Sequence, residues 1–236
     1  MGPQQRVIGV TGAVGGVGAS TAAAATALGM IRRGRPAVLV DLDHGAPGIE
    51  LPLGIEDAQG VRWPDLSEAQ GEVDGEGLVS VLPHWRGVPV VSGRRRSPLP
   101  ADDVVLDVCA GIARTGRVVV LDLPRPSSWS GAVRALLRGC DVAVLVAPLT
   151  FAGAAAAELV RDQFLAAGVP DVRVVVRGPA PGRVVPELLG DALGLPVEGT
   201  LLRDRSLPEA VERGDGPPAG SRNAVGRLAA ELGAAL

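Results

Sequence analysis

The sequence of 236 residues predicts an α/β protein with a doubly wound, mostly parallel sheet that carries helices on both faces. Continuous apolar runs rich in Val are typical of strands buried on both faces. Helical stretches separate most of these runs. Glycine and acidic motifs follow several runs, at the carboxyl ends where such sheets bind ligands. Because 47% of the residues are hydrophobic, we expect one substantial core and a single domain over residues 1–236.

The apolar runs predict strands at residues 6–10, 37–40, 88–91, 117–121, 142–146 and 172–176. Helices are expected at 20–33, 102–114, 130–138, 152–167 and 184–193, and a closing helix at 222–236. Gly34 and Gly168 end two of these helices. The segment 45–87 is less regular, so we expect surface helices and loops there. Residues 214–220 are rich in Gly and Pro and are expected to form a turn or an exposed loop.

The first strand leads into a glycine-rich loop and a helix start, a pattern that predicts phosphate binding. The loop consists of Gly15, Gly16, Val17, Gly18, Ala19, Ser20 and Thr21. Glycines let backbone N–H groups wrap a phosphate, and a lysine normally adds the charge. The chain has no lysine, and position 19 is Ala although Arg is frequent elsewhere, so this charge has been lost and not exchanged. A glycine turn without a ligand is the alternative.

Acidic residues follow two of the predicted strands. Asp41 and Asp43 come directly after the second strand, and Asp122 follows the fourth. Because side chains alternate along an extended chain, Asp41 and Asp43 are expected on the same side. An aspartate in the position of Asp122 holds the water shell of Mg²⁺, a cation that retains several waters in proteins. The order of loop and acids along the chain predicts a nucleotide site with Mg²⁺.

Two loop templates fit the glycines. Thr11, Gly12, Gly16 and Gly18 have the spacing of short-chain dehydrogenases. That resemblance implies a Tyr and Lys pair for proton transfer, and the chain has neither residue type, so only an inert relative that binds a dinucleotide stays open. The second template looks like the deviant Walker A loop of the MinD/ParA group, GGxGK followed by Ser or Thr, and lacks only the lysine.

With these motifs the chain resembles P-loop NTPases of the MinD/ParA group, in their CpaE/TadZ-like branch, which includes actinobacterial septum-site-determining proteins. The resemblance rests on residues 15–21, 41–43, 45–54, 122–125, 140–150 and 195–204. It implies that Gly15 to Ser20 wrap the phosphates of ATP and that Thr21 lies near the α-phosphate. It also implies that Ser20 ligates Mg²⁺, that Asp43 orients the attacking water and that Asp122 holds the metal through water.

Three departures from the group affect the expected chemistry. The signature lysine before the double glycine is Val14, the loop lysine is Ala19, and the position of the adenine contact holds Arg177 where the group usually has Asn. A catalytic cation supplied in trans contributes roughly 10³ to 10⁵ in rate. Backbone amides, a helix N-terminus and Mg²⁺ still neutralise phosphate. We therefore expect ATP binding with slow or no hydrolysis, unless an arginine such as Arg125 or Arg177 replaces the lost cation.

The resemblance implies a positional regulator of the division septum or of a pilus or secretion machine, with a nucleotide-independent scaffold and a slow ATPase with a relocated cation as alternatives. We expect a cytoplasmic homodimer recruited to a pole or septum by protein partners. The net charge of −3 gives no general attraction to nucleic acid. The closing helix lacks large apolar anchors, so no direct membrane anchor is expected. Relatives often carry a receiver-like domain ahead of the loop, which we expect to be absent here because the first strand begins by Arg6.

Overall fold

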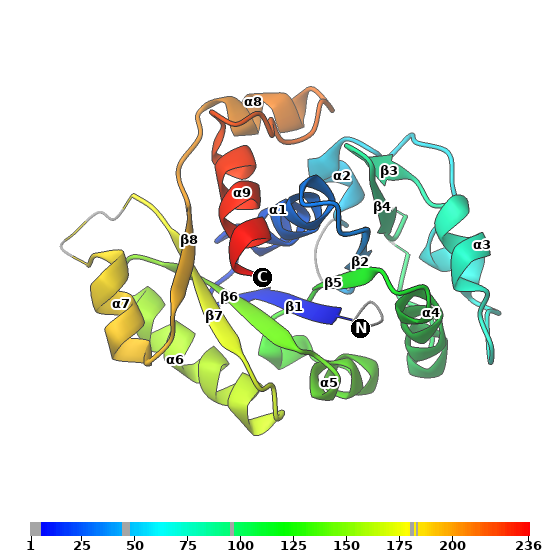
Figure 1. Ribbon diagram of the computed structural model, residues 1–236, viewed down its shortest axis with the longest axis horizontal. Helices are drawn as coiled ribbons and strands as arrows, with labels where there is room; N and C mark the ends of the chain where they lie inside the picture. Colours follow the sequence, from blue (N-terminus) through cyan, green and yellow to red (C-terminus); the bar gives the residue numbers. More distant parts are fainter. Residues whose placement is uncertain (1–5, 44–47, 95–96, 180–181, 183) are drawn as a thin grey trace.

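A computed structural model describes residues 6–43, 48–94, 97–179, 182 and 184–236 (Figure 1). The described strands form one eight-stranded sheet in the order β3-β4-β2-β5-β1-β6-β7-β8. The strands are β1 (Arg6–Gly12), β2 (Ala37–Asp41), β3 (His84–Trp85), β4 (Val88–Val91), β5 (Val118–Asp122), β6 (Val142–Pro148), β7 (Val172–Arg177) and β8 (Val197–Leu201). Every neighbouring pair is parallel except β3 with β4. The predicted doubly wound, mostly parallel sheet is confirmed.

Helices cover both faces of the sheet, with α1 and α9 on one face and α4, α5, α6 and α7 on the other (Figure 1). The helices are α1 (Ala19–Arg32), α2 (Glu50–Leu53), α3 (Gly75–Ser80), α4 (Asp102–Arg114), α5 (Gly131–Arg138), α6 (Phe151–Ala166), α7 (Pro186–Leu193), α8 (Ser206–Glu212) and α9 (Ala224–Ala235). Two short 3₁₀ helices span Trp63–Leu66 and Pro126–Ser128. None of the described helices is long and apolar enough to cross a membrane.

Alternation along the central strands separates two hydrophobic cores. In β5, Val118 and Val120 pack in the core beneath α1 and α9, whereas Val119 and Leu121 pack in the core of α4 to α7. All four side chains are nearly inaccessible to solvent. This explains why the central strands have apolar residues at consecutive positions and not at alternate ones. The sheet is thus fixed from both sides, and its carboxyl edge is a rigid platform.

Three elements were not predicted from the sequence. Strand β8 contains Glu198, Gly199 and Thr200, and its residues are mostly half-buried at the sheet edge, so it has no continuous apolar run. Strand β3 has only two residues, and α8 is a short helix with one buried residue. The prediction of a turn or exposed loop at 214–220 was wrong in part, because Gly216 and Pro217 are buried. Residues 45–47 of the family resemblance lie outside the described residues.

The closing helix α9 packs closely on α1. A methyl group on Gly29 of α1 would overlap the carbonyl oxygen of Ala229, and one on Gly233 of α9 would lie 2.7 Å from the carbonyl oxygen of Gly29. The two glycines therefore let the helix backbones touch. Leu228 and Leu232 of α9 are fully buried in the same core as α1.

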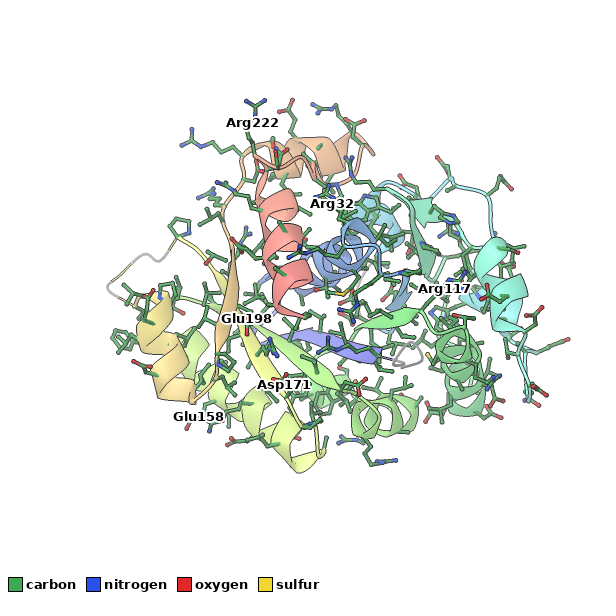
Figure 2. The ribbon with its side chains drawn as sticks, in the orientation of Figure 1. Arg32, Arg117, Glu158, Asp171, Glu198 and Arg222 are labelled. Atoms are coloured by element: carbon green, nitrogen blue, oxygen red, sulfur yellow. The ribbon has the colours of Figure 1, made fainter. Side chains whose placement is uncertain are left out.

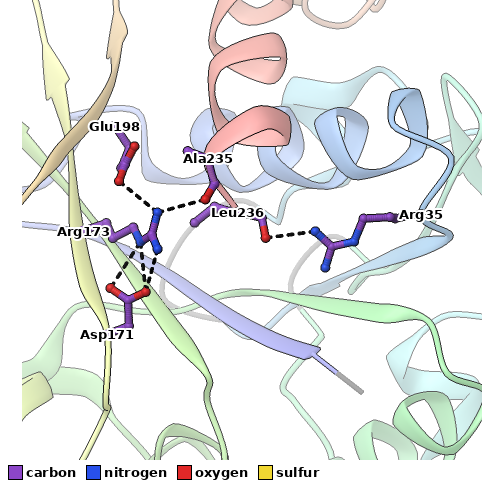
Figure 3. Close-up of polar contacts among 6 residues, drawn as sticks. All are labelled: Arg35, Asp171, Arg173, Glu198, Ala235 and Leu236. Carbon is purple, nitrogen blue, oxygen red and sulfur yellow. Dashed lines mark hydrogen bonds and ion pairs between the residues drawn. The ribbon is translucent and has the colours of Figure 1, made fainter. Parts of the chain in front are cut away.

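A polar network, which we call the clamp, holds the end of α9 (Figure 3). Arg173 donates to both carboxylate oxygens of Asp171, to Glu198 at 2.8 Å and to the carbonyl oxygen of Ala235 at 2.9 Å. Arg35 donates to the carbonyl oxygen of Leu236 at 2.9 Å. Figure 2 labels Glu198 on β8 and Asp171 directly before β7. The clamp satisfies carbonyls that a helix end leaves unpaired.

Candidate functional site

The carboxyl ends of β1, β2 and β5 surround a cleft of about 400 Å³, which we call the loop cleft. It is lined by the whole predicted phosphate loop from Gly15 to Thr21 and also by Asp41, Asp43 and Asp122. The topology explains this meeting, because β5 lies between β1 and β2 and all three run in parallel. The structure therefore brings together every predicted site residue except Arg177.

The backbone of the loop is shaped by positive φ angles at Gly16 (71°) and Gly18 (99°). Side chains rarely tolerate such angles, so glycine is required at both positions. Gly18 precedes α1, and the first amide that bonds back into this helix is that of Ala22. The amides of Ala19, Ser20 and Thr21 are thus left without intrahelical partners at the positive end of the helix dipole. This arrangement can bind an anion.

The loop is anchored from below by apolar side chains. Val17 is buried, and its side chain is part of the core beneath α1. Val14 and Ala19, which stand where the resemblance implies lysines, are half-buried and pack against the same core. The two positions contribute to packing, and neither supplies charge to the cleft.

Asp122 is the most unusual residue of the cleft. Its side chain is 1% exposed, and neither of its buried carboxylate oxygens has a hydrogen-bond partner among the described residues. Burial raises the pKa of Asp122 well above its usual value, and the negative charge of Asp41 raises it further. The Ser20 hydroxyl is close enough to lower this pKa but does not reach hydrogen-bonding geometry. A buried carboxylate without donors is unfavourable, so an outside partner is required to satisfy it.

Asp41 is also buried, but it is hydrogen-bonded. Its oxygens accept the amides of Asp43 at 3.0 Å and Ile49 at 2.9 Å, so it holds the segment that follows β2. Burial raises the pKa of Asp41 to about 7 even though these two hydrogen bonds act in the opposite direction. Asp43 lies just beyond the strand and lines the same cleft. The pair thus divides into a carboxylate that organises the backbone and one that is available to a ligand.

The residues of the cleft fit a hydrated cation better than a bare one. Among the described residues no group of three or more His, Cys, Asp or Glu has the geometry of a metal site. The orphaned oxygens of Asp122 instead need hydrogen-bond donors, and the waters around Mg²⁺ provide them. Ser20 and Asp43 line the same cleft as Asp122.

The structure places Arg177 elsewhere. It ends β7, which is separated from β1 by β6, and it is not among the residues that line the cleft. Its guanidinium donates to the carbonyl oxygen of Leu202 at 3.3 Å. Burial lowers the pKa of Arg177, and the positive charge of Arg203 lowers it further. The only basic residue among the described lining of the loop cleft is Arg125.

Thr11 contributes to the site in a way that sequence reasoning missed. Its fully buried hydroxyl lies 3.2 Å from the carbonyl oxygen of Leu123 and 3.0 Å from that of Pro124, and donates to this pair of acceptors. It thus ties the end of β1 to the segment after β5. The sequence contains no signal for this contact, because Thr11 appears there only as part of the dehydrogenase template.

Comparison with known proteins supports the same class of fold. No family model matches the chain. It is 38% identical over 209 residues to an uncharacterized protein of Mycobacterium tuberculosis strain H37Rv, a match that covers 88% of this chain and 57% of the relative. The chain thus spans a little over half the length of that relative. It is 24% identical over 227 residues to a putative septum site-determining protein MinD of Nephroselmis olivacea, with 90% and 80% covered.

Solved structures agree with the fold over almost the full chain. A ParA family ATPase from Chlorobium tepidum superposes with a TM-score of 0.79 at 15% identity, covering 97% of both chains. MinD from Pyrococcus horikoshii in complex with Mg-ADP gives 0.75 at 16% identity, covering 97% of this chain and 94% of that one. MinD in a MinC:MinD complex from Aquifex aeolicus gives 0.77 at 16%, covering 98% and 95%. The chain therefore has the fold of MinD/ParA P-loop NTPases.

Proposed function

We propose that the loop cleft binds ATP with Mg²⁺ and that the protein acts as a positional regulator with slow or no ATP hydrolysis. The observation that carries this proposal is Asp122, whose buried carboxylate has no hydrogen-bond partner and faces the cleft. A purely structural glycine turn would not need such a group. The complex of the structural neighbour from Pyrococcus horikoshii with Mg-ADP supports the choice of ligand.

In this proposal, the amides from Gly15 to Thr21 bind the phosphates, and the positive end of α1 adds to their attraction. Ser20, Asp43 and Asp122 hold the hydrated metal. Asp43 positions a water molecule. The metal, when bound, supplies positive charge to the phosphate oxygens. Hydrolysis is slow because Val14 and Ala19 replace two cations.

The cellular role is proposed from the same fold and from the named relatives. We infer a cytoplasmic regulator of septum placement or partitioning, with pilus or secretion machinery as the alternative target in the CpaE/TadZ-like branch. It works as a homodimer recruited to a pole or septum by protein partners. The complex of MinD with MinC supports protein partners. The buried apolar face of α9 supports the absence of an anchor in this helix.

The test of the nucleotide site is a calorimetric titration with ATP, with and without Mg²⁺. We expect micromolar to submillimolar binding that needs Mg²⁺ and that Asp122→Ala weakens. Arg222→Ala, an exposed change beside α8, is the control (Figure 2). No detectable binding at millimolar nucleotide would contradict the proposal.

A nucleotide-independent scaffold is the second candidate, favoured by the loss of both lysines. Light scattering with and without Mg·ATP separates the two candidates, because the regulator is expected to form dimers only with nucleotide. A steady-state phosphate-release assay on wild type and Asp43→Ala then distinguishes slow hydrolysis from none.

A further inference from the structure

The loop cleft has an unbalanced set of charges. Asp41, Asp43 and Asp122 line it, together with a single arginine, Arg125. The described residues form no ion pair with Arg125, whereas Arg161, Arg173 and Arg213 each pair with two carboxylates. Arg125 is an exposed side chain at the mouth of the cleft. A cation beside an anion-binding loop, with no protein partner, is available to a ligand.

The guanidinium of Arg125 lies close to Gly15 of the phosphate loop. A methyl group built on Gly15 would be 3.8 Å from Nη1 of Arg125 and 4.0 Å from Cζ. Because Gly15 has no side chain, the guanidinium can approach the loop backbone at this position. Gly16 has no neighbour that a methyl group would meet within 4 Å. Arg125 therefore lies next to the loop at Gly15, where both residues line the cleft.

The backbone that carries Arg125 is fixed by hydrogen bonds. Pro124 accepts from Thr11 at 3.0 Å and from the indole of Trp129 at 2.9 Å. The carbonyl oxygen of Arg125 accepts the amide of Ser128 at 2.8 Å. Trp129 is buried and stacks on Phe164, with ring centroids 5.8 Å apart. The Cα of Arg125 is thus held relative to the loop, and only the side chain must order on binding.

We infer that Arg125 binds phosphate oxygens of the nucleotide from within the same chain and replaces the charge lost at Ala19. A guanidinium stays protonated and matches phosphate with paired donors, which suits this role. The charge comes from the segment after β5 and not from the loop, so it approaches the phosphates from the side of Gly15. This inference rests on the proposed nucleotide site. Arg177 is the rival, and its contact with Leu202 places it outside the cleft.

The experiment compares the affinities of wild type, Arg125→Ala, Arg125→Lys and Arg177→Ala for Mg·ATP, AMP and inorganic pyrophosphate by calorimetry. Loss of charged hydrogen bonds to phosphate predicts that Arg125→Ala weakens ATP and pyrophosphate about tenfold to a hundredfold. AMP is expected to change less, and Arg125→Lys to recover part of the loss. Because the Arg125 side chain is exposed, the melting temperature of the Arg125→Ala variant should match that of wild type.

The outcomes separate the two proposals. If wild type binds ATP and Arg125→Ala stays within twofold, the role of Arg125 is overturned and the nucleotide site stands. If Arg177→Ala causes the larger loss of affinity for ATP, Arg177 supplies the charge and the role of Arg125 is overturned. If wild type binds pyrophosphate but not ATP, the nucleotide proposal fails, and the inference that Arg125 binds phosphate oxygens of a nucleotide fails with it. If wild type binds neither ligand, both are overturned.

Discussion

The clamp and the loop cleft both hold charged groups at the ends of sheet strands, partly buried in the clamp and fully buried at Asp122 in the cleft, and they differ in how those groups are satisfied. In the clamp, Arg173 pairs with Asp171 and Glu198 and caps the carbonyl of Ala235. In the cleft, both oxygens of Asp122 are buried without a partner. Folding alone explains the clamp, because every charge there has an internal partner. The cleft holds a carboxylate that is costly unless something from outside the chain completes it.

The largest expected loss of stability is at the contact between α1 and α9, the helix whose end the clamp holds. Gly29→Ala places a methyl group onto the carbonyl oxygen of Ala229 in α9, so α1 and α9 must separate. We expect a loss of roughly 3 kcal/mol, which outweighs the better helix propensity of Ala. Chemical unfolding measures it. Gly139→Ala is the matched control, because a methyl group there would lie 3.5 Å from the carbonyl oxygen of Leu136, an ordinary van der Waals distance.

Breaking the clamp itself should cost slightly less. Arg173→Ala leaves Asp171 and Glu198 without their partner, and its side chain is only 20% exposed, so we expect a loss of about 2 kcal/mol. The clamp lies at the amino end of β7, across the sheet from the cleft, so ATP affinity should not change. Unfolding curves and calorimetry check the two expectations together. A fall in affinity at unchanged stability would contradict the separation of the two regions.

The buried acids of the cleft predict that the metal-free protein becomes less stable as pH rises. Burial raises the pKa of Asp41 to about 7 and raises that of Asp122, so the folded state holds protons that the unfolded state releases near pH 4. Stability therefore decreases as pH rises from about 4 to 7. The lowered pKa values of Asp65 and Asp204 act only at lower pH. In EDTA we expect the free energy of unfolding to be roughly 2 kcal/mol lower at pH 7.5 than at pH 5.

Mg²⁺ with ATP should reduce this pH dependence, because a bound cation favours the ionised carboxylates. Melting at pH 5 and pH 7.5, each with and without Mg·ATP, measures the change. A metal-free protein that is more stable at pH 7.5 than at pH 5 would show that the buried acids are satisfied in some other way.

Much of the fold was predictable because the central strands can be recognised from their own residues. The predicted bounds of β2 and β4 differ from the observed ones by at most one residue, since consecutive Val and Leu residues identify strands buried on both faces. Strand β8 was missed because an edge strand that contains Glu198 and Gly199 has no such pattern. The clamp depends on contacts between residues 35, 173, 198 and 235, and nothing in the local sequence indicates which of them meet.

The candidate site was likewise predictable only in part. The loop and the acids could be placed in one cleft because parallel strands bring their carboxyl ends to one edge. The sequence could not choose between Arg125 and Arg177, since both follow strands of the same sheet. Only the order of the strands separates them. The contact of Thr11 with Pro124 could not be predicted either, because it joins β1 to the segment after β5, 113 residues further along the chain.

The most direct measurement compares Asp122→Asn with Asp171→Asn in chemical unfolding at pH 7.5 without metal, and then in Mg·ATP titration. If Asp122 is kept for an external cation, Asp122→Asn replaces a buried acid, whose ionisation is unfavourable without a partner, by a neutral amide. This change should stabilise the protein by roughly 1–2 kcal/mol while ATP binding is lost. Asp171→Asn should instead destabilise the protein and leave ATP binding intact. If Asp122→Asn were destabilising and still bound Mg·ATP as wild type does, the account of the cleft would be wrong.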